Sequence, residues 1–97
     1  MEPGIPDISI SDVVISTAGR DQGQLFYCIG TDNQYVSLAD GKGRTLDKPK
    51  RKKRKHVQKV LRAETRVADK IRNGDKVLNS ELRRDLAFLI REMQSMT

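Results

Sequence analysis

Apolar residues in the first half of the chain form short runs separated by turn-forming residues. Val13–Ile15 and Leu25–Ile29 are rich in β-branched and aromatic side chains, which favour pleated strands. Tyr35–Ala39 repeats the pattern, and Arg44–Asp47 predicts a short fourth strand that ends before Pro49. Short strands joined by glycine-rich and Asx-rich turns over roughly 40 residues predict a small β-barrel.

The loop between the first two predicted strands contains two glycines. Gly19 and Gly23 bracket Arg20, Asp21 and Gln22. Because glycine adopts positive φ without steric cost, both glycines are expected to shape a hairpin loop longer than the minimal two-residue turn. Arg20 would stand at the tip of this loop, where it either contacts a ligand or pairs with Asp21.

The hydrophobic period changes in the second half of the chain. Apolar residues at helical spacing predict a first amphipathic helix, with Val57, Val60, Leu61, Val67, Ala68 and Ile71 on one face. Asn73-Gly74 is a helix stop, and Asn79 or Ser80 is the expected cap of a second helix. The apolar stripe of that helix consists of Leu82, Leu86, Leu89, Ile90 and Met93. The two helices are expected to pack on each other or on the barrel.

Charge is distributed unevenly along the chain. Residues 1–47 carry three basic and seven acidic side chains, a net charge of −4, whereas residues 48–56 carry seven basic and no acidic ones. Residues 57–97 add nine basic and six acidic side chains, and the overall net charge is +6. We therefore expect an acidic barrel, with the main electrostatic anchor for a polyanion behind it.

These patterns predict an α+β fold in four segments. Residues 1–7 are expected to be a flexible N-terminus and residues 8–48 the β-barrel. Residues 49–56 are expected to be an extended, solvated basic linker, because a run of like charges repels itself. Residues 57–97 are expected to be a helical C-terminal segment.

The strand–loop–strand unit VVISTAGRDQGQLFYCI, residues 13–29, resembles the KOW motif of ribosomal proteins and NusG-type transcription elongation factors. The run ADGKGRTLDKPKRKKRKH, residues 39–56, resembles the segment after that motif in the KOW-domain RNA-binding protein family of bacteria. That family is similar to a KOW-containing large-subunit ribosomal protein of archaea and eukaryotes. The resemblance implies a KOW-type, SH3-like barrel that binds ribosomal RNA and associates with the ribosome or its assembly. The sequence departs from the family at Gln22 and Gln24, where lysines are frequent.

The expected RNA contacts are cations, because phosphate contacts supply most of the affinity of RNA-binding proteins. The basic run is expected to supply affinity without sequence specificity, through Lys48, Lys50, Arg51, Lys52, Lys53, Arg54 and Lys55. Arg20, Lys42 and Arg44 are expected to help set position. Gly19 and Gly23 either let backbone amides approach a phosphate or only shape the loop.

Aromatic residues and ribosomal proteins complete the expected binding properties. Tyr27 and Tyr35 lie in predicted strands, so core packing is favoured over base stacking. Ribosomal proteins are possible additional partners. The alternative function is a KOW-type protein-interaction module of the translation or transcription machinery, whose apolar contacts would resist salt.

The sequence shows no catalytic or metal-binding pattern. His56, the single histidine, lies in the basic run without an obvious carboxylate partner, and Cys28 is expected to be a small buried hydrophobe. A single cysteine fits a reducing compartment, and no apolar run is long enough to span a bilayer. We therefore expect a cytoplasmic protein that is not an enzyme and has no cofactor, metal, membrane or small-molecule partner.

Overall fold

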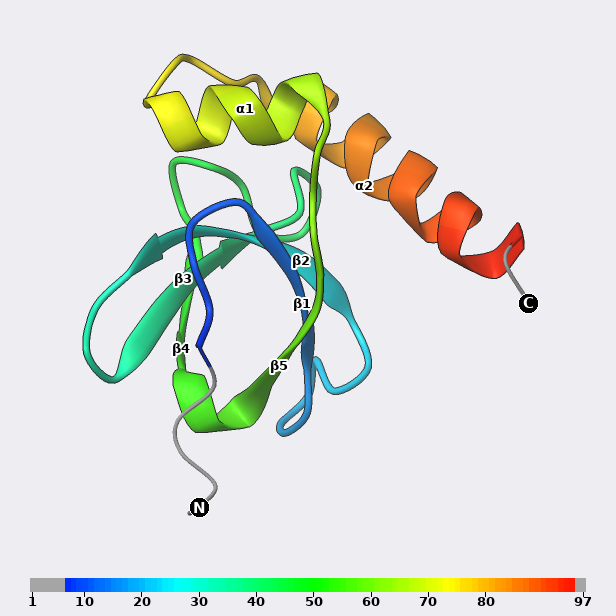
Figure 1. The fold of residues 1–97 in the computed structure, drawn as a ribbon. Coiled ribbons are helices and arrows are strands. Elements are labelled where there is room, and N and C mark those ends of the chain that lie inside the picture. Colours follow the sequence, from blue (N-terminus) through cyan, green and yellow to red (C-terminus); the bar gives the residue numbers. More distant parts are fainter. Residues whose placement is uncertain (1–6, 96–97) are drawn as a thin grey trace.

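Five strands form one antiparallel sheet in the order β4-β3-β2-β1-β5, and two helices lie at one end of it (Figure 1). The computed structural model describes residues 7–95. The elements in chain order are β1 (Asp12–Ser16), β2 (Leu25–Thr31), β3 (Tyr35–Ala39), β4 (Lys50–Lys53), the 3-10 turn η1 (Arg54–His56), β5 (Val57–Arg62), α1 (Arg66–Asn73) and α2 (Asn79–Ser95).

The α+β class is confirmed. The sheet is curved but not closed, because β4 and β5 remain its two edges. Except for Asp7, which is exposed, the segment predicted as a flexible N-terminus lies outside the described residues.

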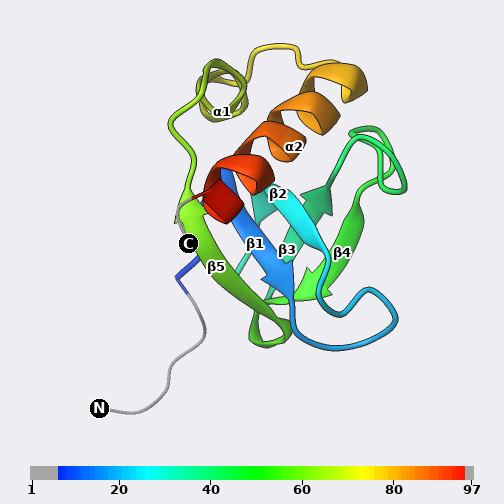
Figure 2. The same cartoon turned by 90° about the vertical axis from the view of Figure 1, so that its right-hand side faces the viewer.

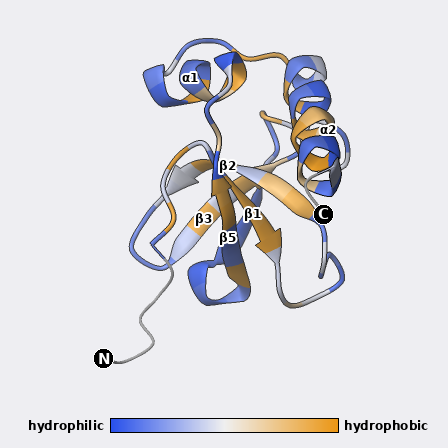
Figure 3. Cartoon of the chain, turned by 45° about the vertical axis from the view of Figure 1, so that its right-hand side comes forward, coloured by the Kyte–Doolittle hydropathy of each residue, from blue (hydrophilic) through white to orange (hydrophobic). Residues whose placement is uncertain are grey.

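The central strands β1 and β2 are buried on both faces of the sheet. Val13 pairs with Tyr27, and both belong to a core cluster that includes residues of α1 and α2. Val14 pairs with Phe26, and both belong to a second cluster formed within the curved sheet. A strand buried on both faces reads as a continuous apolar run, which is the pattern that predicted these two strands. Figure 3 shows the result, with hydrophobic colouring on the central strands.

The loop between β1 and β2 has the predicted glycine geometry. Gly19 and Gly23 have φ angles of +87° and +90°, in the left-handed region that favours glycine. The Gly23 N–H donates to the Ser16 carbonyl at 2.8 Å, and the Ser16 N–H donates to the Gln24 carbonyl at 3.0 Å. These bonds join the two ends of the loop, and the positive φ expected at both glycines is confirmed.

The basic segment predicted as a linker is part of the sheet. Lys50–Lys53 forms β4, which pairs with β3 so that Lys52 lies opposite Val36 and Lys53 opposite Tyr35. The prediction was wrong because a run of cations has no alternation of apolar and polar residues, which leaves the period of two invisible. The prediction of an acidic barrel is therefore also wrong. Residues 7–62, which contain the whole sheet, carry twelve basic and six acidic side chains, a net charge of +6.

Two further elements differ from prediction. Val57–Arg62 is strand β5, paired with β1, so the first helix begins only at Arg66. The apolar residues of Val57–Arg62 are also spaced as on one face of a helix, but the segment pairs with the edge of β1 and forms a strand instead. The fourth strand predicted at Arg44–Asp47 is a turn, with one isolated bridge between Thr45 and Lys48.

Both helices have recognisable ends. Thr65 caps α1 by accepting a hydrogen bond from the Ala68 N–H, and Gly74 ends it in the left-handed conformation, as predicted. The cap of α2 differs from prediction, since helix begins at Asn79 and the Glu81 carboxylate accepts the Leu78 N–H at 3.0 Å. The side chain of Asn79 instead accepts a hydrogen bond from the Leu46 N–H at 2.8 Å.

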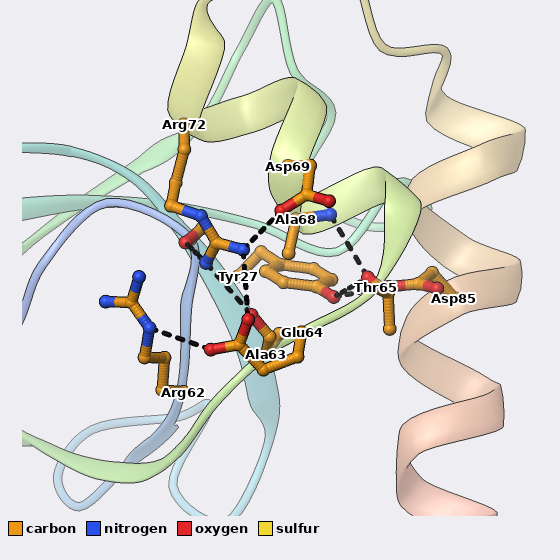
Figure 4. A network of polar contacts seen from close by, with 10 residues as sticks. Tyr27, Arg62, Ala63, Glu64, Thr65, Ala68, Asp69, Arg72 and Asp85 are labelled. Carbon is orange, nitrogen blue, oxygen red and sulfur yellow. Dashed lines mark hydrogen bonds and ion pairs between the residues drawn. The ribbon is translucent and has the colours of Figure 1, made fainter.

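A polar network fastens the helices to the sheet (Figure 4). The buried Tyr27 hydroxyl on β2 donates to the Asp85 carboxylate of α2, which also accepts a hydrogen bond from Thr65 at 2.8 Å. Burial, followed by the hydrogen bond to Asp85, raises the pKa of the Tyr27 hydroxyl. Arg72 of α1 donates to the Ser11 hydroxyl, just before β1, at 2.8 Å and to the Ala63 carbonyl, just after β5, at 2.9 Å. These contacts fix the helices beside the sheet, where Figure 2 shows α2 crossing in front of it.

Candidate nucleic-acid interface

Two lysines of the basic run point inward. Lys52 Nζ lies 2.5 Å from Asp21 Oδ1, and Lys50 Nζ lies 3.3 Å from Asp21 Oδ2. Ser16 Oγ also donates to Asp21 Oδ1, at 2.7 Å. Burial alone would raise the pKa of Asp21, but hydrogen bonds from Lys52, Ser16 and Lys50 hold that pKa well below its usual range.

The inward pair corrects two expectations. Lys52 is only 8% exposed and donates a second hydrogen bond to the Ala18 carbonyl at 2.6 Å, so it is neither solvated nor available to RNA. Lys50 is half-buried and shares the same carboxylate. Asp21 is turned inward toward Lys50 and Lys52, so of the two alternatives for Arg20, local pairing with Asp21 is the one that the structure does not form. Arg20 itself is exposed on the loop.

The outward face of the same edge carries a stacked arginine. Arg51 lies 3.9 Å above the centroid of the Tyr35 ring, and its Nη2 donates to Asp32 Oδ2 at 2.9 Å. The hydrogen bond from Arg51, together with those from the Gln34 and Tyr35 N–H groups, lowers the pKa of Asp32. The Asp32 carboxylate is therefore ionised at neutral pH and pairs with the guanidinium above the Tyr35 ring.

A hollow of about 230 Å³ lies beside this stack, lined by Gln34, Lys53, Arg54 and Lys55. Arg54 is held by the turn between β2 and β3, because its N–H donates to the Gln34 carbonyl at 2.8 Å and its Nε to the Asp32 carbonyl at 2.8 Å. Lys53 and Lys55 are exposed, and among residues 7–95 neither has a carboxylate within ion-pair distance. Two exposed cations without an ion-pair partner among the described residues thus flank a hollow beside the turn between β2 and β3.

The remaining predicted cations lie at the other end of the sheet. Lys42, Arg44 and Lys48 are exposed on the loop between β3 and β4, beside the helices, whereas η1 lies at the opposite end (Figures 1 and 2). The Asp40 carboxylate accepts the N–H groups of Lys42 and Arg44, both at 2.9 Å. The structure therefore separates these three cations from Lys53 and Lys55.

The loop between β3 and β4 packs closely against the start of α2. Gly41 has a φ of +80°, and a Cβ atom there would lie 2.3 Å from the Asn79 carbonyl oxygen. This approach shapes an open groove of about 460 Å³, with Leu25, Leu86 and Ile90 among its apolar lining and Lys42 and Arg83 among its polar lining. Arg83 was missed at the sequence level because a cation on an exposed helix face has no distinctive pattern.

The sequence also missed the contributions of Tyr35, Asp32 and Gln34. Tyr35 was expected in the core, yet it is half-buried under Arg51 on the outward face. The turn Asp32-Asn33-Gln34 carried a turn signal but no binding signal. Tyr27 is buried, as core packing requires.

A reactive thiol, a metal cluster and a membrane-spanning helix are the other features that could indicate a function in the part of the chain that the structure describes. Burial raises the pKa of the Cys28 thiol to about 11, so a reactive thiolate is disfavoured at neutral pH. Residues 7–95 contain no group of three or more His, Cys, Asp or Glu side chains placed to hold a metal ion. In the same residues, no helix combines the length and apolar character needed to cross a membrane.

No protein-family model matches the chain, and no curated protein sequence matches it.

Proposed function

We propose that the chain is a non-catalytic RNA-binding protein of the cytoplasm, which binds ribosomal RNA and acts with the ribosome or in its assembly. The observation that carries the proposal is the pair Lys53 and Lys55, two exposed cations without a carboxylate partner among residues 7–95, at the rim of one hollow. Such cations neutralise phosphates and release their counterions, which favours binding.

The charge balance of the sheet supports the same function. Asp21 and Asp32 bind Lys50, Lys52 and Arg51, so five charged groups are engaged with one another. The remaining positive charge of residues 7–62 is carried largely by exposed side chains. A surface of this kind attracts a polyanion over several ångströms at physiological salt, where the Debye length is about 8 Å.

The finer fold assignment is part of this proposal. A curved five-stranded antiparallel sheet, with the KOW-like hairpin at its centre, supports an SH3-like barrel of the KOW type. The assignment to ribosomal RNA rests on the sequence resemblance of residues 13–29 and 39–56.

Crosslinking in cells, followed by sequencing of the bound RNA, tests the proposal. The wild-type chain should recover ribosomal RNA, and a Lys53→Gln/Lys55→Gln variant should recover much less. Arg66→Gln/Lys76→Gln is the matched control, because it removes two exposed charges from the region of α1. Wild-type crosslinks without enrichment of ribosomal RNA would contradict the ribosomal assignment. Equal recovery of RNA by the two variants would contradict a binding site at Lys53 and Lys55.

A protein-interaction module is the second candidate function, and the groove beside α2 favours it. Its apolar lining by Leu25 and Ile90, with Lys42 and Arg83 beside them, suits an acidic protein segment with an apolar side chain. Because much of the contact would be apolar, binding by this groove should weaken less with salt than RNA binding does, and it should weaken on Ile90→Ser. RNA binding at the other end should instead weaken steeply with salt.

A further inference from the structure

The stack of Arg51 on Tyr35 is built on two neighbouring strands and is held from the side. Tyr35 begins β3 and Arg51 lies in β4, the next strand of the sheet. Asp32 fixes the guanidinium at 2.9 Å, and Asp32 itself accepts the Gln34 and Tyr35 N–H groups at 2.9 and 2.7 Å. The arginine plane is therefore oriented before any ligand arrives.

One face of this plane is open. The Arg51 side chain retains 64% of its exposure although one face covers the tyrosine ring at 3.9 Å. A guanidinium plane stacks on aromatic rings, and an unpaired nucleobase is such a ring. Since Asp32 already balances the charge of Arg51, the arginine offers a flat surface more than a free positive charge.

The proposed phosphate contacts at Lys53 and Lys55 adjoin the stack. A second hollow, of about 330 Å³, is lined by Asp32, Asn33, Gln34, Tyr35 and Arg51, and it shares Gln34 with the hollow beside Lys53 and Lys55. Lys53 is paired directly with Tyr35 across the strands. A base on Arg51 and the phosphate of the same strand near Lys53 would thus occupy neighbouring hollows.

We propose that Arg51, stacked on Tyr35, is a platform for an unpaired base, and that this surface therefore selects single-stranded over double-stranded RNA. The inference rests on the proposed RNA-binding function and adds the class of RNA. In a duplex the bases are stacked on one another and cannot cover the arginine plane. Stacking on such a platform depends little on base identity.

The test compares three RNA probes of equal phosphate number: oligouridylate, the same backbone without bases, and a duplex. The wild-type chain should bind oligouridylate about tenfold more tightly than the abasic strand, and more tightly than the duplex. Arg51→Lys keeps the charge but removes the plane, so it should lose the preference for bases while keeping the affinity for the abasic strand. Arg66→Lys is the matched control, because Arg66 is an exposed arginine of α1 outside the proposed surface, and it should keep the preference.

Tyr35→Val supplies a second variant, because it removes the ring beneath the arginine and retains a residue suited to a strand. It should weaken the preference for bases as Arg51→Lys does, with thermal melts showing that both variants are folded.

Equal wild-type affinity for oligouridylate and the abasic strand would overturn the platform while leaving RNA binding intact. An unchanged preference in folded Arg51→Lys would overturn it as well. A wild-type chain that binds none of the probes would instead overturn the proposed function, and the platform with it.

Discussion

Lys52 Nζ lies 2.5 Å from Asp21 Oδ1, which ties the edge strand β4 to the loop between β1 and β2. The Lys52 side chain is 9% exposed and the Asp21 side chain 11% exposed, so the pair is almost entirely removed from water. The contact places one lysine of a basic run inside the fold and leaves its neighbour Lys53 outside. It explains how a segment of like charges is held as a strand.

Asp21→Asn should destabilise the chain by about 3 kcal/mol, because it leaves the buried Lys52 without its counter-charge. Urea denaturation would measure the change in the free energy of unfolding. Arg20→Ala is the control on the same loop and should change that free energy by less than about 0.5 kcal/mol, since Arg20 is exposed. A similar effect of the two substitutions would contradict the buried ion pair.

The same pair should make stability depend on pH in a defined direction. The pKa of Asp21 is lowered in the folded chain, whereas an unfolded aspartate has a pKa of about 3.9. Its contribution is therefore fully present above about pH 4 and is lost as the pH falls toward the lowered pKa. The difference in unfolding free energy between wild type and Asp21→Asn should shrink below about pH 4. A difference that stays constant or grows on acidification would be the wrong sign for this ion pair.

Gly41→Ala should destabilise the chain more than Gly23→Ala. Both glycines have positive φ, so both substitutions carry a backbone cost of about 1–3 kcal/mol. A Cβ at Gly41 would also meet the Asn79 carbonyl at 2.3 Å, whereas nothing lies within 4 Å of one at Gly23. Thermal melts of the two variants isolate this close approach of the loop to α2. Equal losses would show that the loop is free to move away from the helix.

Tyr27→Phe should cost about 1.5–3 kcal/mol, because it removes a buried hydrogen bond to the Asp85 carboxylate. Amide hydrogen exchange should show faster exchange in α2, which this bond fastens to β2. Tyr35→Phe is the control, since Tyr35 is only half-buried and its ring, which Phe retains, makes the contact with Arg51. Unchanged exchange in α2 after Tyr27→Phe would mean that the network does not hold the helix.

The sequence predicts those elements that depend on residues close to one another in the chain. The hairpin of β1 and β2, strand β3, the positive φ at Gly19 and Gly23 and the helix stop at Gly74 are all determined by residues adjacent in the chain. Strand β4 is not, because its partners Val36 and Asp21 are distant in sequence and its own residues are all cations. The prediction for β5 was wrong for another reason, because the spacing of Val57, Val60 and Leu61 fits a helix as well as a strand.

The candidate site was predicted as a set of residues but not as an arrangement. Lys53 and Lys55 were identified from charge alone, and the structure keeps both exposed. Lys50 and Lys52 have the same residue type, and only the alternation of β4 turns them inward. The distance between Lys42 and the basic strand also depends on how the loop between β3 and β4 folds, which the sequence does not encode locally.

The salt dependence of RNA binding tests the central claim most directly. Log affinity for a single-stranded RNA should fall linearly with log salt, with a slope of about −0.7 for each phosphate neutralised. Lys53→Gln/Lys55→Gln should therefore flatten the slope by about 1.4 and weaken binding, while Arg66→Gln/Lys76→Gln, which removes the same charge, should leave the slope nearly unchanged. If Lys53→Gln/Lys55→Gln binds as tightly as wild type with the same slope, the outward face of β4 and η1 is not the RNA-binding surface.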